Sequence, residues 1–196
     1  MASRLSSGRP RRVSRWGRFV ASVLVGAFAL VTLVRALAVD SYGVPTPSMA
    51  PTLLPGQRIL VLTWPWQREP AAGDVVVVDG RGTLAPNAPD SPARTGAWLV
   101  GRNAGDQFVK RVIAVGPARV TCDGAGGPLL VDGAPADVFR AEDCGRKRFD
   151  QRIPKGTVWL MGDNRENSRD SRDLLGAPGG GAISESSIVG RVLGAQ

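Results

Sequence analysis

The chain has 196 residues, enough for a membrane segment and one medium-sized domain with its own core. Its formal net charge is +8, but six arginines lie within the first 18 residues, and the remainder of the chain carries only +2. The positive charge therefore forms a basic tail rather than a basic face, and we expect no nucleic-acid partner.

The sequence contains no histidine and only two cysteines. This composition excludes a Ser-His-Asp triad, a Cys-His dyad, any zinc site with histidine ligands and a Cys₄ metal site within one chain. A serine nucleophile would need another base. The lysines form a short set of candidates: Lys110, Lys147 and Lys155.

The N-terminal segment predicts a membrane anchor. Residues 19–39 are apolar apart from Arg35, and 21 residues of helix would span about 32 Å. The basic flank, residues 1–18, should stay in the cytoplasm, which places residues 40–196 outside. The alternative is a cleaved secretory signal, because Ala36-Leu37-Ala38 imitates a cleavage site. The length of the apolar run favours a retained anchor, and both interpretations export the domain.

The stretch from Val44 to Gly56 contains four prolines, so it cannot be the interior of a helix. We expect an extended, stiff loop that holds Ser48 in one place. The alternative is a proline-rich linker between the anchor and the domain.

The exported part is predicted to be mostly β, with no long stretch of helical periodicity. Asp132-Gly133, after residues 129–131, indicates a hairpin turn, and Trp64-Pro65-Trp66 indicates a turn with packing tryptophans. Residues 81–96 and 177–182 indicate loops. Further strands are expected at residues 58–62, 74–79, 108–115, 157–161 and 188–193.

Two polar features stand out against this background. Lys110 lies inside an apolar strand, where burial would lower the pKa of its amine, whereas its neighbour Arg111 should point to the opposite face. The alternative is an ordinary strand lysine facing water. The second feature, Gly162 to Arg172, is a dense polar stretch after a strand. It is also typical of a solvated turn, and it lacks the spacing of an EF-hand calcium loop.

Three segments together resemble the bacterial type I signal peptidases of the Ser-Lys type. They are P-T-P-S-M-A-P-T-L from Pro45, F-V-K-R-V-I-A-V-G-P from Phe108 and G-D-N-R-E-N-S-R-D-S-R from Gly162. Their order and approximate spacing agree with the family across roughly residues 16–194.

The resemblance implies a mostly β catalytic core with a smaller inserted β region at about residues 117–154, after one N-terminal transmembrane helix. It implies a serine endopeptidase of the plasma membrane that removes signal peptides from exported preproteins. Cleavage would follow small residues, at sites of the A-x-A type. The enzyme would need no cofactor or metal, and it would act beside the lipid bilayer and the export translocon.

Carried over by position, the family motifs imply Ser48 as nucleophile and Lys110 as general base. Thr46 and the backbone N–H of Ser48 would form the oxyanion hole. Ser168 would hydrogen-bond the lysine amine, and an ion pair between Asp170 and Arg172 would brace that loop. Small substrate side chains would occupy a pocket lined by Val44, Pro45, Leu53 and Val109.

The chain departs from the family pattern at three positions. Pro47 and Ala114 stand where many members have glycine, and Thr46 stands where many have serine. Two other functions compete with the peptidase. A self-cleaving Ser-Lys repressor would need a DNA-binding domain where the apolar segment lies, and a non-enzymatic anchored β domain would keep the fold without activity.

Cys122 and Cys144 are expected to form a disulfide, because the domain is exported and the pair brackets a loop of the inserted region. Two separate thiols are the alternative.

Overall fold

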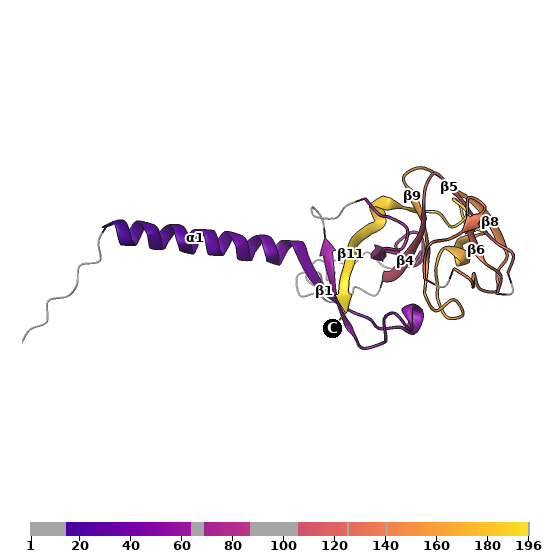
Figure 1. The fold of residues 1–196 in the computed structure, drawn as a ribbon, viewed down its shortest axis with the longest axis horizontal. Coiled ribbons are helices and arrows are strands. Elements are labelled where there is room, and N and C mark those ends of the chain that lie inside the picture. Colours follow the sequence, from indigo (N-terminus) through magenta and orange to yellow (C-terminus); the bar gives the residue numbers. More distant parts are fainter. Residues whose placement is uncertain (1–14, 64–68, 87–105, 125, 140, 196) are drawn as a thin grey trace, which may run out of the picture. The chain divides into compact units, whose positions relative to one another are not determined.

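The computed structural model describes residues 15–63, 69–86, 106–124, 126–139 and 141–195. The chain divides into two compact units, Met1–Leu37 and Ala38–Gln196. Helix α1 (Arg15–Ala38) forms the described part of the first unit (Figure 1). Most of the arginine tail, the Trp64-Pro65-Trp66 turn and most of the predicted 81–96 loop lie outside the described residues.

The described side chains of α1 are exposed, and Trp16, Phe19 and Phe28 are the largest of them. Within the described ranges, no helix meets the combined length and apolarity needed to cross a membrane.

The second unit is built on a seven-stranded sheet with the order β1-β2-β11-β3-β4-β9-β10, in which every pair of neighbours is antiparallel. Antiparallel strands joined by short or folded connections bring residues from distant parts of the chain onto one surface. The strands are β1 (Val39–Gly43), β2 (Arg58–Thr63), β3 (Val75–Asp79), β4 (Gln107–Val115), β9 (Thr157–Met161), β10 (Ile183–Ser184) and β11 (Ile188–Ala195).

A smaller four-stranded sheet has the order β7-β6-β5-β8 and lies wholly within residues 117–154. Its strands are β5 (Ala118–Cys122), β6 (Leu129–Val131), β7 (Ala134–Pro135) and β8 (Phe149–Ile153). Asp132 and Gly133 connect β6 to β7 with φ values of 51° and 84°, as a tight hairpin turn requires. In Figure 1, β5, β6 and β8 gather on one side of the unit, and β1 and β11 lie on the other.

The prediction of a mostly β domain is confirmed, and most strand boundaries agree within two residues. One strand was not predicted, and one local expectation was wrong. Val39–Gly43, of which only Val39 was assigned to the anchor, forms β1, paired with β2. The loop after it is not extended throughout, because Pro47–Met49 form one turn of 3₁₀ helix, η1.

A buried apolar cluster lies directly beneath this turn. Its members come from the loop and from the neighbouring strands, so the turn is fixed to the sheet by packing rather than by proline stiffness alone. The cluster consists of Tyr42, Val44, Met49, Leu53, Ile59, Val61 and Val77.

Candidate active site

Ser48 is the middle residue of η1, and backbone hydrogen bonds to Pro47 and Met49 fix the turn on both sides of it. Pro47 occupies the first position of the turn, where its missing N–H is not needed. The N–H of Ala50 donates to the Pro47 carbonyl at 3.0 Å, and the N–H of Leu53 donates to the Met49 carbonyl at 3.0 Å. Met49 and Leu53 are buried, so the half-buried Ser48 is left on the open side of the turn.

Lys110 reaches the same point from the middle of β4, where it pairs with Val76 of β3. Its side chain is buried, at 2% exposure, and its Nζ donates to Ser48 Oγ at 2.9 Å. The structure thus brings together two residues 62 positions apart that the sequence predicted as nucleophile and base.

Burial lowers the pKa of Lys110 to about 8. Removal of water is the dominant cause, because it disfavours the ammonium, and the positive charge of Arg172 acts in the same direction. The carboxylates of Asp170 and Asp163 act in the opposite direction. An amine with this pKa is neutral in a useful fraction of molecules near neutral pH, and it can then accept the Ser48 proton.

Arg111, the neighbour of Lys110 on β4, is not solvated either. Its side chain is only 12% exposed, and it makes a two-pronged ion pair with Asp163, with Nε–Oδ1 and Nη2–Oδ2 distances of 2.8 and 2.6 Å. Asp163 also accepts from Thr52 Oγ1 at 2.5 Å. The side chains of Lys110 and Arg111 are therefore both covered by protein, because Asp163 of the polar loop contacts Arg111.

Thr46 is exposed, and its Oγ1 donates to Ser48 Oγ at 3.2 Å. Its hydroxyl is therefore close to the attacking oxygen, next to which the carbonyl oxygen of a substrate would become the oxyanion. Pro47 between them has no N–H to offer.

The polar loop is braced by the predicted pair of Asp170 and Arg172, with distances of 2.9 Å from Nε and 2.8 Å from Nη2 and almost no exposure. Asp170 also accepts from the backbone N–H of Gly162 at 3.0 Å, and it caps the 3₁₀ helix η2 (Ser171–Leu174). The carboxylate thereby fixes both ends of the loop.

The predicted hydrogen bond between Ser168 and the Lys110 amine is absent. Ser168 Oγ is buried and has no hydrogen-bond partner among the described residues. It lies against Gly162, where an added Cβ would come within 2.2 Å of it and within 2.4 Å of the Ser48 carbonyl oxygen. The loop therefore packs Ser168 against the Gly162 backbone, whereas the Lys110 amine is bonded to Ser48.

A pocket of about 290 Å³ opens beside Ser48 and Lys110. Val44, Pro45 and Val109 line it as predicted, but Leu53 does not, because its side chain packs into the cluster beneath the turn. Gln107, Asn167 and Arg169 add polar groups to the lining. The described residues contain no group of three or more acidic or sulfur side chains suited to a metal ion.

Comparison with known proteins identifies the family. The family described as signal peptidase, peptidase S26, matches residues 16–194. This chain belongs to the type I signal peptidases, a family of serine endopeptidases.

Among curated signal peptidases, a probable signal peptidase I-1 of Synechocystis sp. is 30% identical, over 87% of this chain and 78% of its own length. A probable signal peptidase I of Mycobacterium leprae is 28% identical, over 92% of this chain and 75% of its own length. A crystal structure of a signal peptidase I from Enterococcus faecalis has a TM-score of 0.40 and 18% identity, covering 65% of this chain and 98% of that one.

The departures from the common signal peptidase pattern fit this fold. Pro47 lies at the first position of η1, which proline favours. Ala114 is buried beside an irregularity in the pairing of β4 with β9, where its small side chain joins the core.

Sequence reasoning missed one residue of this signal peptidase that touches the nucleophile's turn. The N–H of Asn164 donates to the Ser48 carbonyl at 3.1 Å, and its Nδ2 donates to the Pro47 carbonyl at 3.1 Å. The sequence offered one signal for Asn164, which is its place in the polar loop two residues after Gly162. Its partner Pro47 lies 117 positions away, so this contact cannot be predicted from the spacing of residues.

Proposed function

We propose that this signal peptidase cleaves exported preproteins with Ser48 as nucleophile and Lys110 as general base. The distance of 2.9 Å between Lys110 Nζ and Ser48 Oγ carries this proposal, because the lysine is buried and its pKa is lowered to about 8. In a chain without histidine, a deprotonated lysine is the base that this site offers.

In the acylation half of the reaction, the neutral Lys110 amine takes the Ser48 proton as Oγ attacks the scissile carbonyl. The oxyanion that forms would accept hydrogen bonds from Thr46 Oγ1 and the Ser48 N–H. Collapse of this intermediate breaks the C–N bond, and the Lys110 ammonium gives its proton to the leaving amine. Water then attacks the acyl-enzyme, and Lys110 accepts its proton. Lys110 returns that proton to Ser48 Oγ as the ester bond breaks, which restores the Ser48 hydroxyl and the neutral amine.

The pocket supports a preference for small side chains just before the scissile bond. Its apolar wall is formed by Val44, Pro45 and Val109. Its volume is about 290 Å³, and Ser48 also lines it, so the substrate side chain and the scissile bond must fit in the same space. A site of the A-x-A type would fit this wall, whereas large side chains would meet it.

Anchoring in the plasma membrane completes the proposal. Residues 19–39 would cross once, the arginine-rich residues 1–18 would stay cytoplasmic, and residues 40–196 would face outward beside the export translocon. The exposed apolar side chains of α1, such as Phe19, Leu24 and Phe28, support a lipid environment. External protease on sealed cells should digest the domain and spare the tail. Recovery of a soluble protein that begins at Val39 would instead support a cleaved signal.

A peptide-cleavage assay tests the chemistry. The full-length protein in detergent should cut a signal-peptide substrate once, after its A-x-A site, and Ser48→Ala and Lys110→Arg should abolish the cut. Arginine keeps the positive charge but cannot be deprotonated at working pH. An inactive wild-type protein would favour the non-enzymatic anchored domain, and an active Lys110→Arg protein would exclude the Ser-Lys mechanism.

A further inference from the structure

Arg165 connects the polar loop to the inserted region through backbone carbonyls. Its side chain is 4% exposed. Nε donates to the Gly162 carbonyl at 3.0 Å, Nη1 donates to Asp143 O at 2.5 Å and Nη2 donates to Phe139 O at 2.8 Å. The planar guanidinium thus holds acceptors from two separate segments in one fixed arrangement, which a single ammonium cannot do.

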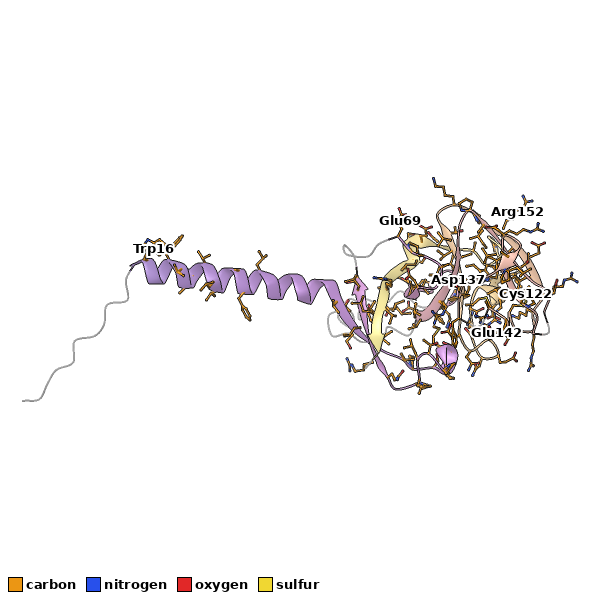
Figure 2. All side chains as sticks on the ribbon, viewed as in Figure 1. Trp16, Glu69, Cys122, Asp137, Glu142 and Arg152 are labelled. Carbon is orange, nitrogen blue, oxygen red and sulfur yellow. A yellow bond between two sulfur atoms is a disulfide. The ribbon has the colours of Figure 1, made fainter. Side chains whose placement is uncertain are left out.

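The segment that receives two of these bonds is itself tied down. Cys144, next to Asp143, is joined by a disulfide to Cys122 on β5, and Cys122 is labelled in Figure 2. The Cys144 N–H donates to the Gly127 carbonyl at 2.9 Å, and the Ala141 carbonyl accepts from Leu129 at 2.7 Å. The position of residues 141–144 therefore depends on the smaller sheet.

The opposite end of the connection reaches the nucleophile. Asn164 precedes Arg165 and donates to both the Pro47 and the Ser48 carbonyls. Gly162, whose carbonyl Arg165 holds, lies so close to Ser48 that an added Cβ would come within 2.4 Å of the Ser48 carbonyl oxygen. A shift of residues 162–165 would therefore displace the turn that carries Ser48.

Two further contacts join the same segments. Arg172 Nη1 donates to the Cys144 carbonyl at 3.4 Å, and the Phe139 ring lies 5.6 Å from the Arg111 guanidinium. The inserted region is thus in contact with three arginines of the polar network around Lys110.

We propose that Arg165 is a positioning residue through which Phe139, Asp143 and the disulfide-bonded Cys144 set the placement of Ser48 opposite Lys110. This inference rests on the proposed function. It adds that the inserted region and its disulfide contribute to turnover, although neither touches the reacting atoms.

The test compares kcat and KM for a signal-peptide substrate, normalised to the concentration of acylatable Ser48. Arg165→Met removes all three hydrogen bonds, and a Cys122→Ala/Cys144→Ala variant removes the anchor of the segment. Each should lower kcat about tenfold with KM nearly unchanged, because misplacing a reacting group by about 1 Å is enough to cost up to 10²-fold. Combining them should lower kcat little further than either alone, because both act through one connection.

Arg119→Met is the matched control. Arg119 is an exposed arginine of the inserted region that pairs with Asp150 at 2.5 Å, and its side-chain hydrogen bonds within the described ranges go to Asp150. Its loss should leave kcat unchanged. If Arg165→Met does not fold, Arg165→Lys replaces it, because lysine keeps the charge but lacks the planar fork that reaches these three carbonyls.

Folded Arg165 variants with wild-type kcat would overturn the inference, and so would a fully active disulfide-free enzyme. If the loss of kcat in the combined variant equals the product of the losses in the Arg165 variant and the disulfide-free variant, the inference would also be overturned. The two changes would then act independently. If the wild-type enzyme is active, none of these results contradicts the proposed function. An inactive wild-type enzyme would instead remove the proposed function and this inference with it.

Discussion

Replacing Lys110 with methionine should abolish catalysis and at the same time stabilise the fold at neutral pH. The folded pKa of Lys110 is about 8, whereas its ordinary value is 10.5. At about 1.4 kcal/mol per pH unit, this difference corresponds to a penalty of about 3 kcal/mol for burying the ammonium. Methionine fills a similar volume without a charge, so most of that penalty should disappear.

The sign of the pH dependence follows from proton counts. Below pH 8 both the folded and the unfolded chain hold the Lys110 proton, and the full penalty is present. Between pH 8 and 10.5 only the unfolded chain holds it, so the stability of the wild type rises with pH. The advantage of Lys110→Met should therefore shrink over this range and vanish above it.

Urea unfolding at pH 7 and near pH 10.5 measures this difference, with exposed Lys155 changed to methionine as the matched control. In the wild type, kcat/KM should rise about tenfold per pH unit below pH 8 and level off above it. A Lys110→Met protein less stable than wild type at pH 7, or a pH-independent kcat/KM between pH 6 and 9, would refute the reasoning.

Three further substitutions test the site. Thr46→Val should lower kcat roughly 10²–10³-fold with little change in KM, whereas Thr46→Ser should keep most activity, because only the hydroxyl serves the oxyanion; an active valine variant would refute that role. Gly162→Ala should destabilise the fold by about 1–3 kcal/mol in urea unfolding and reduce activity, because its Cβ would meet Ser168 Oγ and the Ser48 carbonyl oxygen at 2.2 and 2.4 Å. Gly176→Ala, with open space around it, is the control, and equal stability of the two variants would contradict the predicted crowding. Arg169 lines the pocket and has no ion-pair partner in the described part of the chain. Arg169→Glu should therefore lower kcat/KM for peptides with acidic residues near the scissile bond and raise it for peptides with basic residues there, by about two- to fivefold. An unchanged preference would show that this guanidinium does not meet substrate.

The sequence was sufficient to predict the strands because each depends on a local pattern. The pairing of Ser48 with Lys110 was instead implied by the resemblance to the signal peptidases. Residues 157–161 form a strand because four of them, from Val158 to Met161, are buried apolar positions. The pattern drew attention to Lys110 because it is a lysine inside an apolar strand. The same pattern also fits a lysine whose side chain faces water. The short strand β1 was missed because Val39–Gly43 becomes a strand only by pairing with β2.

Partners across the fold could not be predicted in the same way. The alternation along β4 placed Arg111 on the face opposite Lys110, but it could not show that Asp163, 52 residues later, would pair with Arg111. Ser168 was assigned to the lysine by its place in a motif, but its orientation depends on how Gly162 packs against the turn of Ser48. Side-chain partners in a polar loop are therefore set by packing of the whole loop and not by spacing within it.

The arrangement of charges explains why burial can control Lys110 despite the carboxylates around it. An unpaired Asp170 or Asp163 would stabilise the ammonium and keep the amine protonated. Each carboxylate is instead bonded by both prongs of an arginine, Asp170 by Arg172 and Asp163 by Arg111. The positive charge of Arg172 offsets part of the field of the carboxylates at Nζ, and loss of water remains the dominant influence on the pKa of Lys110. The same pairs fix the polar loop against β4, so one set of contacts both shapes the site and leaves its base able to lose a proton.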